Sequence, residues 1–324
     1  MSTPLGVRHD IGHGDRASAA PPGDQGQALI LSLVFLTVLL GMAAAVLDVG
    51  SWFREDRALQ ASTDAAALAG AQALPYSPGE ATALALDYAA KNGGGIDAGA
   101  IDFEAQILAD DTIVVRGERE APGFFTRVFG LDSVDVHATA KARAGTMSAA
   151  RWVAPIVVNE QHPMLQCGCF GDGYPTEIAL ANLHQSGSGD AAGAFALLEL
   201  DSGSGTAGES TVAGWMAKGF EGFMPLGIYN SVPSTMWNGG AFQNAFNLRV
   251  GDEVLFPVYR PPIVAGGSTA EFDIIGWVGF HITGSRGGGS SARVEGWFTK
   301  IIWEGIQGDS PGPDFGARAI MLVE

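Results

Sequence analysis

Basic residues are scarce in this sequence, where 18 Lys and Arg stand against 35 Asp and Glu for a formal net charge of −17. Nucleic-acid-binding surfaces need clustered positive charge, so the balance excludes nucleic acid as a partner. It also argues against peripheral binding to anionic lipid beyond what a membrane anchor itself provides. The acids are scattered along the chain, which is typical of a solvated surface that keeps a protein soluble.

Cysteine is nearly absent, since Cys167 and Cys169 are the only two. Three interpretations of the pair stay open: a disulfide, two free thiols, or metal ligands completed by His162 and Asp172. The Cys-Gly-Cys string lacks the paired spacing of zinc modules, so we predict no metal. A disulfide would pin the Gly-rich loop 166–175.

The sequence also lacks the common catalytic strings, because no GxSxG, HExxH or Walker motif occurs. Gly203–Gly208 does have the glycine spacing of dinucleotide-binding loops, with Glu221 further on. No alternating run of strands and helices follows it, so we favour a loop that leads into a helix. We therefore predict no cofactor and no enzymatic activity.

Long apolar runs are absent except for one, residues 28–47, which contain 20 residues and no charge. A hydrocarbon core about 30 Å thick takes about 20 apolar residues in a helix. A soluble core helix of this length would show a polar stripe, which this run lacks. The run predicts a single transmembrane helix with the lipid bilayer as its partner.

A cleaved secretory signal is the alternative, because Ala43–Ala45 satisfies the small-residue cleavage rule. The apolar run continues through Val46 and Leu47 and is long for a signal core, which favours an anchor. Residues 48–74 then contain no proline and no turn cluster and are rich in helix formers. A single helix from 28 to 74 would be about 70 Å long at 1.5 Å per residue. We assign 26–74 as the transmembrane helix and its extramembrane extension.

Three strings lie in a fixed order along this helix: Gly26-Gln27-Ala28, Asp48-Val49-Gly50 and residues 59–71, LQASTDAAALAGA. Together they resemble the Tad domain of TadG-like and TadE-like proteins, which are membrane proteins of bacterial Flp (tight adherence) pilus assembly. The resemblance covers about residues 25–75 and continues loosely to 145. It implies an anchor in the bacterial cytoplasmic membrane, N-terminus inside, with pilus or secretion-machinery proteins as partners and no enzymatic chemistry.

The family-motif and helix-interface residues are Gly26, Gln27, Asp48, Gly50, Gln60 and Asp64. Asp48 and Asp64 are candidates for pairing with a partner helix, and the alternative for Asp48 is that it marks the membrane interface. Prepilins are usually cut after a glycine, with a Glu five residues into the mature chain. Cleavage after Gly26 would place Leu31 there, which argues against prepilin processing.

Charge does not assign the orientation of the helix, because Arg8 and Arg16 before the run balance Arg54 and Arg57 after it. The resemblance and the mass of chain that follows the run favour a cytoplasmic N-terminus. We expect residues 1–25 to form a disordered cytoplasmic tail.

Residues 75–145 predict a small α+β unit packed on the long helix. A helix begins at Ser77 with a capping box to Glu80, and strands surround the Asp110–Asp111 turn. Residues 122–131 predict a short aromatic helix, and 134–144 alternate as a half-buried strand does. A long helix against a small antiparallel sheet resembles pilin architecture. Residues 145–151 predict a linker.

Residues 150–324 predict an exported, Gly-rich, mainly β domain, so the whole chain is α+β. The expected strands are 153–158, 194–200, 253–259, 271–284, 292–303 and 318–323, with helices at 211–219, capped by Ser210, and 241–248. The 271–303 pair predicts a hairpin across Gly287–Gly289.

An aromatic set in this domain is interpreted mainly as core, although such residues also build binding faces. Its members are Trp215, Phe220, Phe223, Tyr229, Trp237, Phe242 and Phe246. We predict a membrane-anchored structural or assembly component of a Flp pilus or related secretion apparatus. A surface adhesin or ligand-binding module displayed by the anchor is the first alternative, and an exported hydrolase with a dispersed site is the second.

Overall fold

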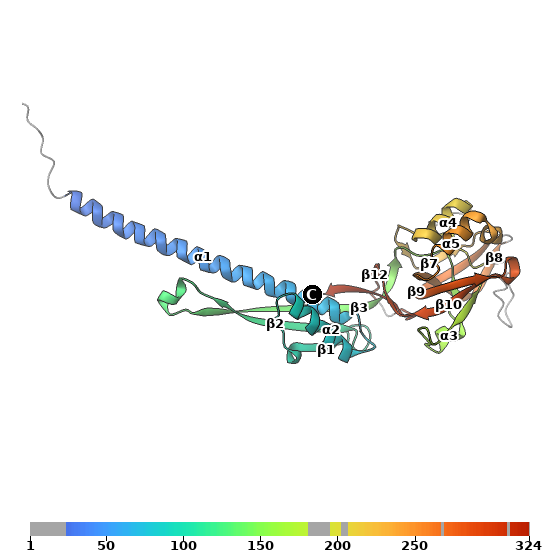
Figure 1. The fold of residues 1–324 in the computed structure, drawn as a ribbon, viewed down its shortest axis with the longest axis horizontal. Coiled ribbons are helices and arrows are strands. Elements are labelled where there is room, and N and C mark those ends of the chain that lie inside the picture. Colours follow the sequence, from blue (N-terminus) through green and yellow to red (C-terminus); the bar gives the residue numbers. More distant parts are fainter. Residues whose placement is uncertain (1–23, 181–194, 202–206, 267–268, 310–311, 324) are drawn as a thin grey trace, which may run out of the picture. The chain divides into compact units, whose positions relative to one another are not determined.

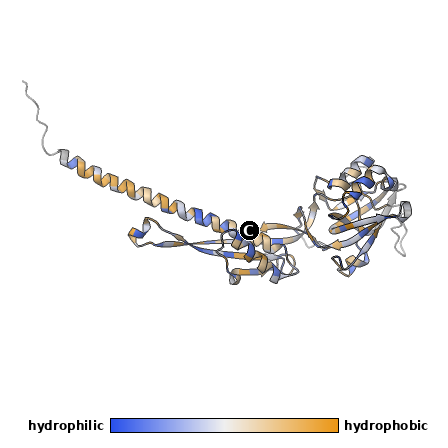
Figure 2. Ribbon diagram, viewed as in Figure 1, coloured by the Kyte–Doolittle hydropathy of each residue, from blue (hydrophilic) through white to orange (hydrophobic). Residues whose placement is uncertain are grey.

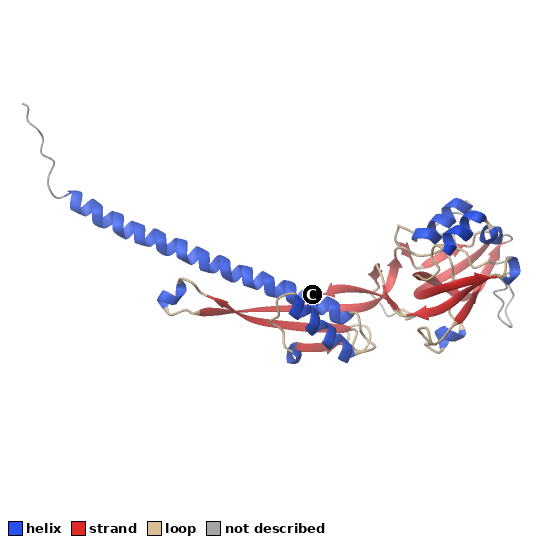
Figure 3. Ribbon diagram, viewed as in Figure 1, coloured by secondary structure: helices blue, strands red, loops and turns tan. Residues whose placement is uncertain are grey.

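The computed structural model describes residues 24–180, 195–201, 207–266, 269–309 and 312–323. The chain is α+β, as the sequence predicts, with one long N-terminal helix followed mainly by strands (Figures 1 and 3). The α-helices are α1 (Asp24–Ala71), α2 (Pro78–Lys91), α3 (Pro163–Gln166), α4 (Glu209–Lys218) and α5 (Gly240–Asn247). The short 3-10 helices are η1 (Ala98–Ala100), η2 (Thr126–Phe129), η3 (Ser234–Asn238) and η4 (Gly289–Ser291).

Among the described residues, seven strands form a first sheet with the order β1-β2-β3-β13-β11, and β6 and β12 also pair with β3. These strands are β1 (Ile101–Glu104), β2 (Thr112–Pro122), β3 (Ser133–Ala150), β6 (Met224–Pro225), β11 (Ile301–Ile302), β12 (Gly305–Gln307) and β13 (Ala317–Val323). β13 runs antiparallel to β3, from Arg318 opposite Thr146 to Val323 opposite Lys141. The last strand of the chain therefore lies in the sheet that its first strands build.

A second sheet of six described strands has the order β4-β8-β9-β10-β5, with β7 paired to β9. Its strands are β4 (Val158–Asn159), β5 (Thr176–Ala179), β7 (Gly227–Asn230), β8 (Glu253–Gly266), β9 (Thr269–Arg286) and β10 (Arg293–Thr299). The predicted hairpin over 271–303 is confirmed, because β9 and β10 pair antiparallel. In Figure 3, α4 and α5 lie together on one side of this sheet, and α3 lies on the other.

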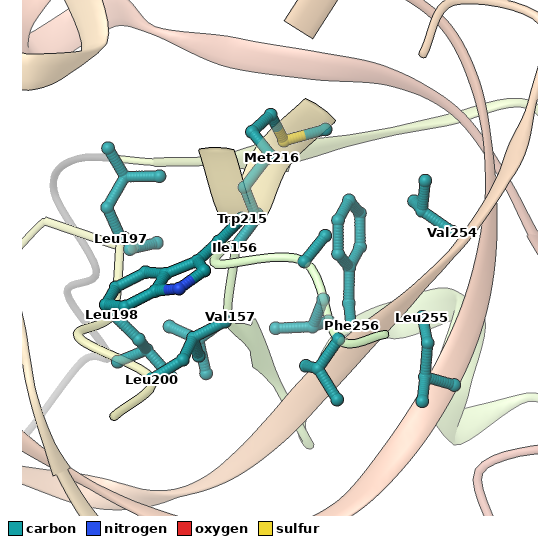
Figure 4. Close-up of a cluster of buried hydrophobic side chains, with 14 of the residues drawn as sticks. Ile156, Val157, Leu197, Leu198, Leu200, Trp215, Met216, Val254, Leu255 and Phe256 are labelled. Atoms are coloured by element: carbon teal, nitrogen blue, oxygen red, sulfur yellow. The ribbon is translucent and has the colours of Figure 1, made fainter. Parts of the chain in front are cut away.

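The larger hydrophobic core fills the space between the second sheet and its helices. Figure 4 shows Trp215 and Met216 of α4 near Phe256 of β8, with Ile156 and Leu197 from the connecting segments. A smaller core of alanines and β-branched residues joins α1 and α2 to the first sheet. Alanine at these positions lets the helix backbones approach the strands closely.

Two local predictions in the first half are wrong in detail. Ser77 is the N-cap residue of α2 and Pro78 is its first residue, but the Ser77 side chain makes no capping hydrogen bond. Residues 145–150 are not a linker but the last part of β3, where Met147 is buried. A β-carbon on Gly145 would lie 3.0 Å from the Gln307 side chain, so this small residue serves close packing.

Three further predictions need correction. Residues 195–200 form isolated bridges, Ile156 to Leu197 and Leu198 to Ser231, in place of the strand predicted over 194–200. α4 is capped by Gly208, and Ser210 lies inside the helix. The aromatic helix predicted over 122–131 is only the 3-10 turn η2. The predicted domain boundaries at 25, 74, 145 and 150 stay predictions.

The described chain divides into two compact units, one with residues 24–54 and 121–134 and one with residues 55–120 and 135–323. The first holds the apolar half of α1 and the connection between β2 and β3. We call residues 123–132 of that connection the β2–β3 tip.

Candidate functional site

The first half of α1 is apolar on every side. Over the described residues, it is the one helix that is long and apolar enough to cross a membrane, and none of its most apolar window is buried inside the protein. Leu29, Leu36 and Leu40 are all more than half exposed, and Figure 2 shows the apolar colour continuing around this part of the helix. Thr37, one of its few polar residues, donates to the Leu33 carbonyl at 2.8 Å, which satisfies the hydroxyl within the helix.

The second half of α1 is packed against the protein. Leu59, Ala66 and Ala67 are fully buried, and the Ser62 hydroxyl donates to the Gly94 carbonyl at 3.0 Å. A β-carbon on Gly117 of β2 would lie 2.8 Å from the Thr63 hydroxyl oxygen, so strand and helix touch here. The helix changes from an exposed apolar rod to a core element within a few turns, which is the pattern expected of an anchor that carries a folded unit.

Asp48 stands directly after the apolar run, and its side chain is fully buried. Its carboxylate accepts backbone N–H bonds from Phe124 at 3.1 Å, Phe125 at 2.9 Å and Thr126 at 2.6 Å. The N–H groups at the start of the turn η2 need acceptors, and a carboxylate is the strongest that a side chain offers. This family-motif residue therefore fixes the β2–β3 tip to α1.

Gln60 and Asp64 lie one turn apart on α1 and bond to each other, with the Gln60 amide donating to the Asp64 carboxylate at 2.6 Å. The same amide nitrogen lies 3.3 Å from the Thr139 carbonyl of β3. Both residues line a shallow pocket of about 280 Å³ with Lys141 and Leu322. The pocket is open and is shared by the helix, β3 and the end of β13.

The remaining family-motif residues, Gly26, Gln27 and Gly50, are exposed. A β-carbon on Gly26 or Gly50 would meet nothing within 4 Å, and Gln27 is exposed near the start of α1. Within the described chain, these three residues do not join Asp48, Gln60 or Asp64 in one site. The predicted tail 1–25 falls almost wholly outside the described residues.

Cys167 and Cys169 are joined by a disulfide at the end of α3. His162 has its ring nitrogens engaged, with Nδ1 accepting from the Met164 N–H at 3.2 Å and Nε2 at 3.2 Å from the Glu177 carbonyl oxygen. Burial lowers the pKa of His162, which favours the neutral ring that this cap requires. No cluster of three or more His, Cys, Asp or Glu in the described chain is placed to hold a metal ion.

The dinucleotide-like string falls mostly outside the described residues, which resume at Ala207. Gly208 is the N-cap of α4, and the Ala207 N–H donates to the Glu199 carboxylate at 2.9 Å. Most of the aromatic set is core: Trp215, Tyr229, Trp237, Phe242 and Phe246 are buried. Phe223 is 47% exposed and is the clearest exception.

A charge cluster around the buried guanidinium of Arg318 escaped the sequence analysis. The Arg318 side chain is only 2% exposed and donates to the Asp314 carboxylate at 2.5 Å and to the Ala144 carbonyl at 3.0 Å. The Tyr76 hydroxyl donates to Asp314 at 2.6 Å, and the Lys300 ammonium lies 3.5 Å from the centre of the Tyr76 ring. No local pattern indicates these contacts, because Tyr76 and Asp314 are separated by 238 residues.

The charged groups in this cluster shift one another's pKa values. Burial opposes ionisation of Asp314, but Arg318 and the Tyr76 hydroxyl outweigh it and lower the pKa of the carboxyl. Burial also opposes the charge on Arg318, yet Asp314 raises the pKa of the guanidinium. Burial and the Asp314 carboxylate raise the pKa of Tyr76 to about 12. The cluster is a structural ion pair that ties the segment after α1 to the start of β13.

Residues 26–73 match the model of the Tad family, described as putative Flp pilus-assembly TadE/G-like. The match spans nearly all of α1 and includes Asp48, Gln60 and Asp64, so the resemblance seen in the motif residues is confirmed for this segment. Neither the curated proteins nor the solved structures gave a match to the chain. The comparison relates the N-terminal segment to Flp pilus assembly, and the apolar helix agrees with membrane anchoring.

Proposed function

We propose that this chain is a single-pass membrane protein that serves as a structural or assembly component of a Flp pilus or related secretion apparatus. α1 holds it in the bacterial cytoplasmic membrane with the N-terminus inside, and the chain from Asp48 onward is extracytoplasmic. Its partners are the bilayer and other proteins of that machinery, and it has no catalytic role.

One observation carries the proposal: the segment that matches the Tad family is the helix whose first half is apolar and exposed. About 20 apolar residues span a hydrocarbon core. The packed second half of α1 then joins the anchor to the first sheet without a break in the helix. A membrane anchor that is continuous with a packed helix suits a structural component of such an apparatus.

Anchoring is tested by replacing Leu36, which lies near the middle of the apolar run. Leu36→Arg places a charge at the centre of the hydrocarbon core, at a cost of about 3 kcal/mol on insertion scales. We expect the variant to leave the membrane fraction in large part, while Leu36→Ile stays in it. Equal retention of both variants would contradict the anchor.

Assembly is tested in cells from which the gene for this chain is deleted and which are then complemented with the wild type or with Leu36→Arg. An assembly component predicts that cells without it display no surface pili and that the wild type restores them. Pili that assemble normally while cells fail to adhere would refute the assembly role and favour a displayed adhesin.

A displayed ligand-binding module is the second candidate function. A pocket of about 290 Å³ on the second sheet is lined by Trp297, Glu177 and Glu295, among others. The Trp297 ring stacks on His281 with ring centres 4.2 Å apart. A partly exposed aromatic beside carboxylates suits a sugar-like ligand. Binding of glycans by the chain, and its loss in Trp297→Ala, would support this function.

A further inference from the structure

The β2–β3 tip exposes an unusual density of large apolar side chains. Val128 is 83% exposed, Phe129 80%, Phe124 64% and Leu131 53%. Monomeric proteins rarely leave such clusters in water, and contiguous apolar patches usually mark a binding surface. The tip contains η2 and is closed at its base by the Gly123 N–H, which donates to the Asp132 carbonyl at 2.9 Å.

The position of the tip along α1 is fixed by Asp48. Its bonds to the N–H groups of Phe124, Phe125 and Thr126 hold the tip backbone at the level of residue 48. The apolar run ends one residue earlier, and at 1.5 Å per residue its length equals the thickness of a hydrocarbon core, about 30 Å. The tip therefore lies where α1 leaves the membrane.

The charge of the tip also suits lipid. Arg127 and Asp132 are its only charged residues, and their side chains pair at 3.9 Å. The tip is thus neutral in a chain of net charge −17, and it does not repel an anionic lipid surface. Trp52 lies one turn beyond Asp48 on the same helix, and aromatic residues are enriched at this depth of membrane proteins.

We propose that the β2–β3 tip inserts its apolar side chains into the extracytoplasmic face of the bilayer that holds α1. This second lipid contact rests on the proposed anchoring of α1. Lipid is the occupant that the geometry favours, because the exposed side chains continue the apolar surface of the anchor at its exit point. Asp48 is the positioning residue, since its bonds set the depth of the tip.

The test uses the full chain reconstituted in vesicles of phosphatidylethanolamine and phosphatidylglycerol. A single environment-sensitive fluorophore is attached, without reductant, to Val128→Cys, Leu36→Cys or Val250→Cys. The native cysteines form a disulfide and do not compete for the label. Val250 is 42% exposed in the turn before β8 and is the matched control. Lipids with a shallow or a deep doxyl quencher then report depth.

We expect the shallow quencher to reduce fluorescence at Val128 several-fold more than at Val250, and the deep quencher to act most strongly at Leu36. Quenching at Leu36 without quenching at Val128 would overturn the tip proposal and leave the anchor standing. Absence of quenching at both would overturn the anchoring as well. The fluorophore at Val128 could instead show a blue-shifted emission that neither quencher reduces and that grows with protein density. That result would assign the tip to contact with a second copy of the chain and refute lipid insertion.

The positioning role of Asp48 has its own readout. Asp48→Ala removes the acceptor for the N–H groups of the tip, so shallow quenching at Val128 should fall while deep quenching at Leu36 stays unchanged. Quenching at Val128 that is identical in the variant would show that Asp48 does not set the depth of the tip.

Discussion

Replacing Asp314 by alanine tests how far the buried charge of Arg318 depends on its carboxylate partner. The change leaves the guanidinium, 2% exposed, with the Ala144 carbonyl as a remaining acceptor and with its Nε still lacking a partner. It also removes the acceptor of the Tyr76 hydroxyl. The perturbation creates a buried charge without a counter-charge and does not merely delete a surface contact.

Breaking a buried ion pair by removing one partner costs about 3–5 kcal/mol. The Asp314 side chain is 26% exposed, so water can enter part of the vacated space and the lower end of the range applies. A loss of about 3 kcal/mol lowers the melting temperature by roughly 6–12 °C in a folded region of this size. Melting of the detergent-solubilised chain, followed by near-ultraviolet circular dichroism at neutral pH, measures the shift.

Two further variants make the experiment decisive. Asp309→Ala removes an exposed carboxylate just upstream and should leave the melting temperature unchanged. Combining Asp314→Ala with Arg318→Met removes both charges and keeps a long apolar side chain at position 318, so it should recover most of the loss. A single variant that melts with the wild type, or a double variant as unstable as the single one, would refute the reasoning.

Three further outcomes are expected. Gly70→Ala should lower the unfolding free energy, measured by denaturant titration, by about 1–3 kcal/mol, because its β-carbon would lie 2.9 Å from the Ala81 carbonyl oxygen. The control Gly79→Ala places its β-carbon in open space and should raise the unfolding free energy slightly. Asp111→Ala should cost about 2–4 kcal/mol at neutral pH. Burial opposes ionisation of Asp111, but the N–H groups of residues 106–108 lower its pKa, so its contribution is present above pH about 4 and lost as pH falls through that lowered pKa. The pKa of Tyr76 is raised to about 12, so the stabilisation that its neutral hydroxyl contributes is complete below pH about 10 and is lost as pH rises through about 12. Tyr76→Phe should therefore reduce the loss of stability in alkali.

The sequence alone was sufficient to predict the elements whose formation depends on residues close together in the chain. The apolar run and the unbroken helix after it predict α1 to within three residues at each end. The Gly287–Gly289 turn between two apolar strands predicts the β9–β10 hairpin. In both cases the signal lies within the segment that forms the element and needs no contact with residues distant in sequence.

The failures come from partners distant in sequence. The stretch that begins at Gly145 is small and polar enough to resemble a linker, yet Gln307 packs on it and donates to the carbonyls of Arg143 and Ala319. Asp48 was selected from a motif, but its contacts come from the tip, more than seventy residues later. A sequence shows that a carboxylate follows the apolar run and does not show which N–H groups reach it.

The return of β13 to the first sheet has a consequence for the order in which the chain folds. Residues 141–146 of β3 gain their β13 partner only when residues 317–323 have been synthesised, since these two segments pair antiparallel. Until then, one edge of β3 is open to any other strand, including that of a neighbouring nascent chain. A chain truncated before β13 would keep this edge open, so pairing of β3 depends on a strand that lies more than 170 residues further along the sequence.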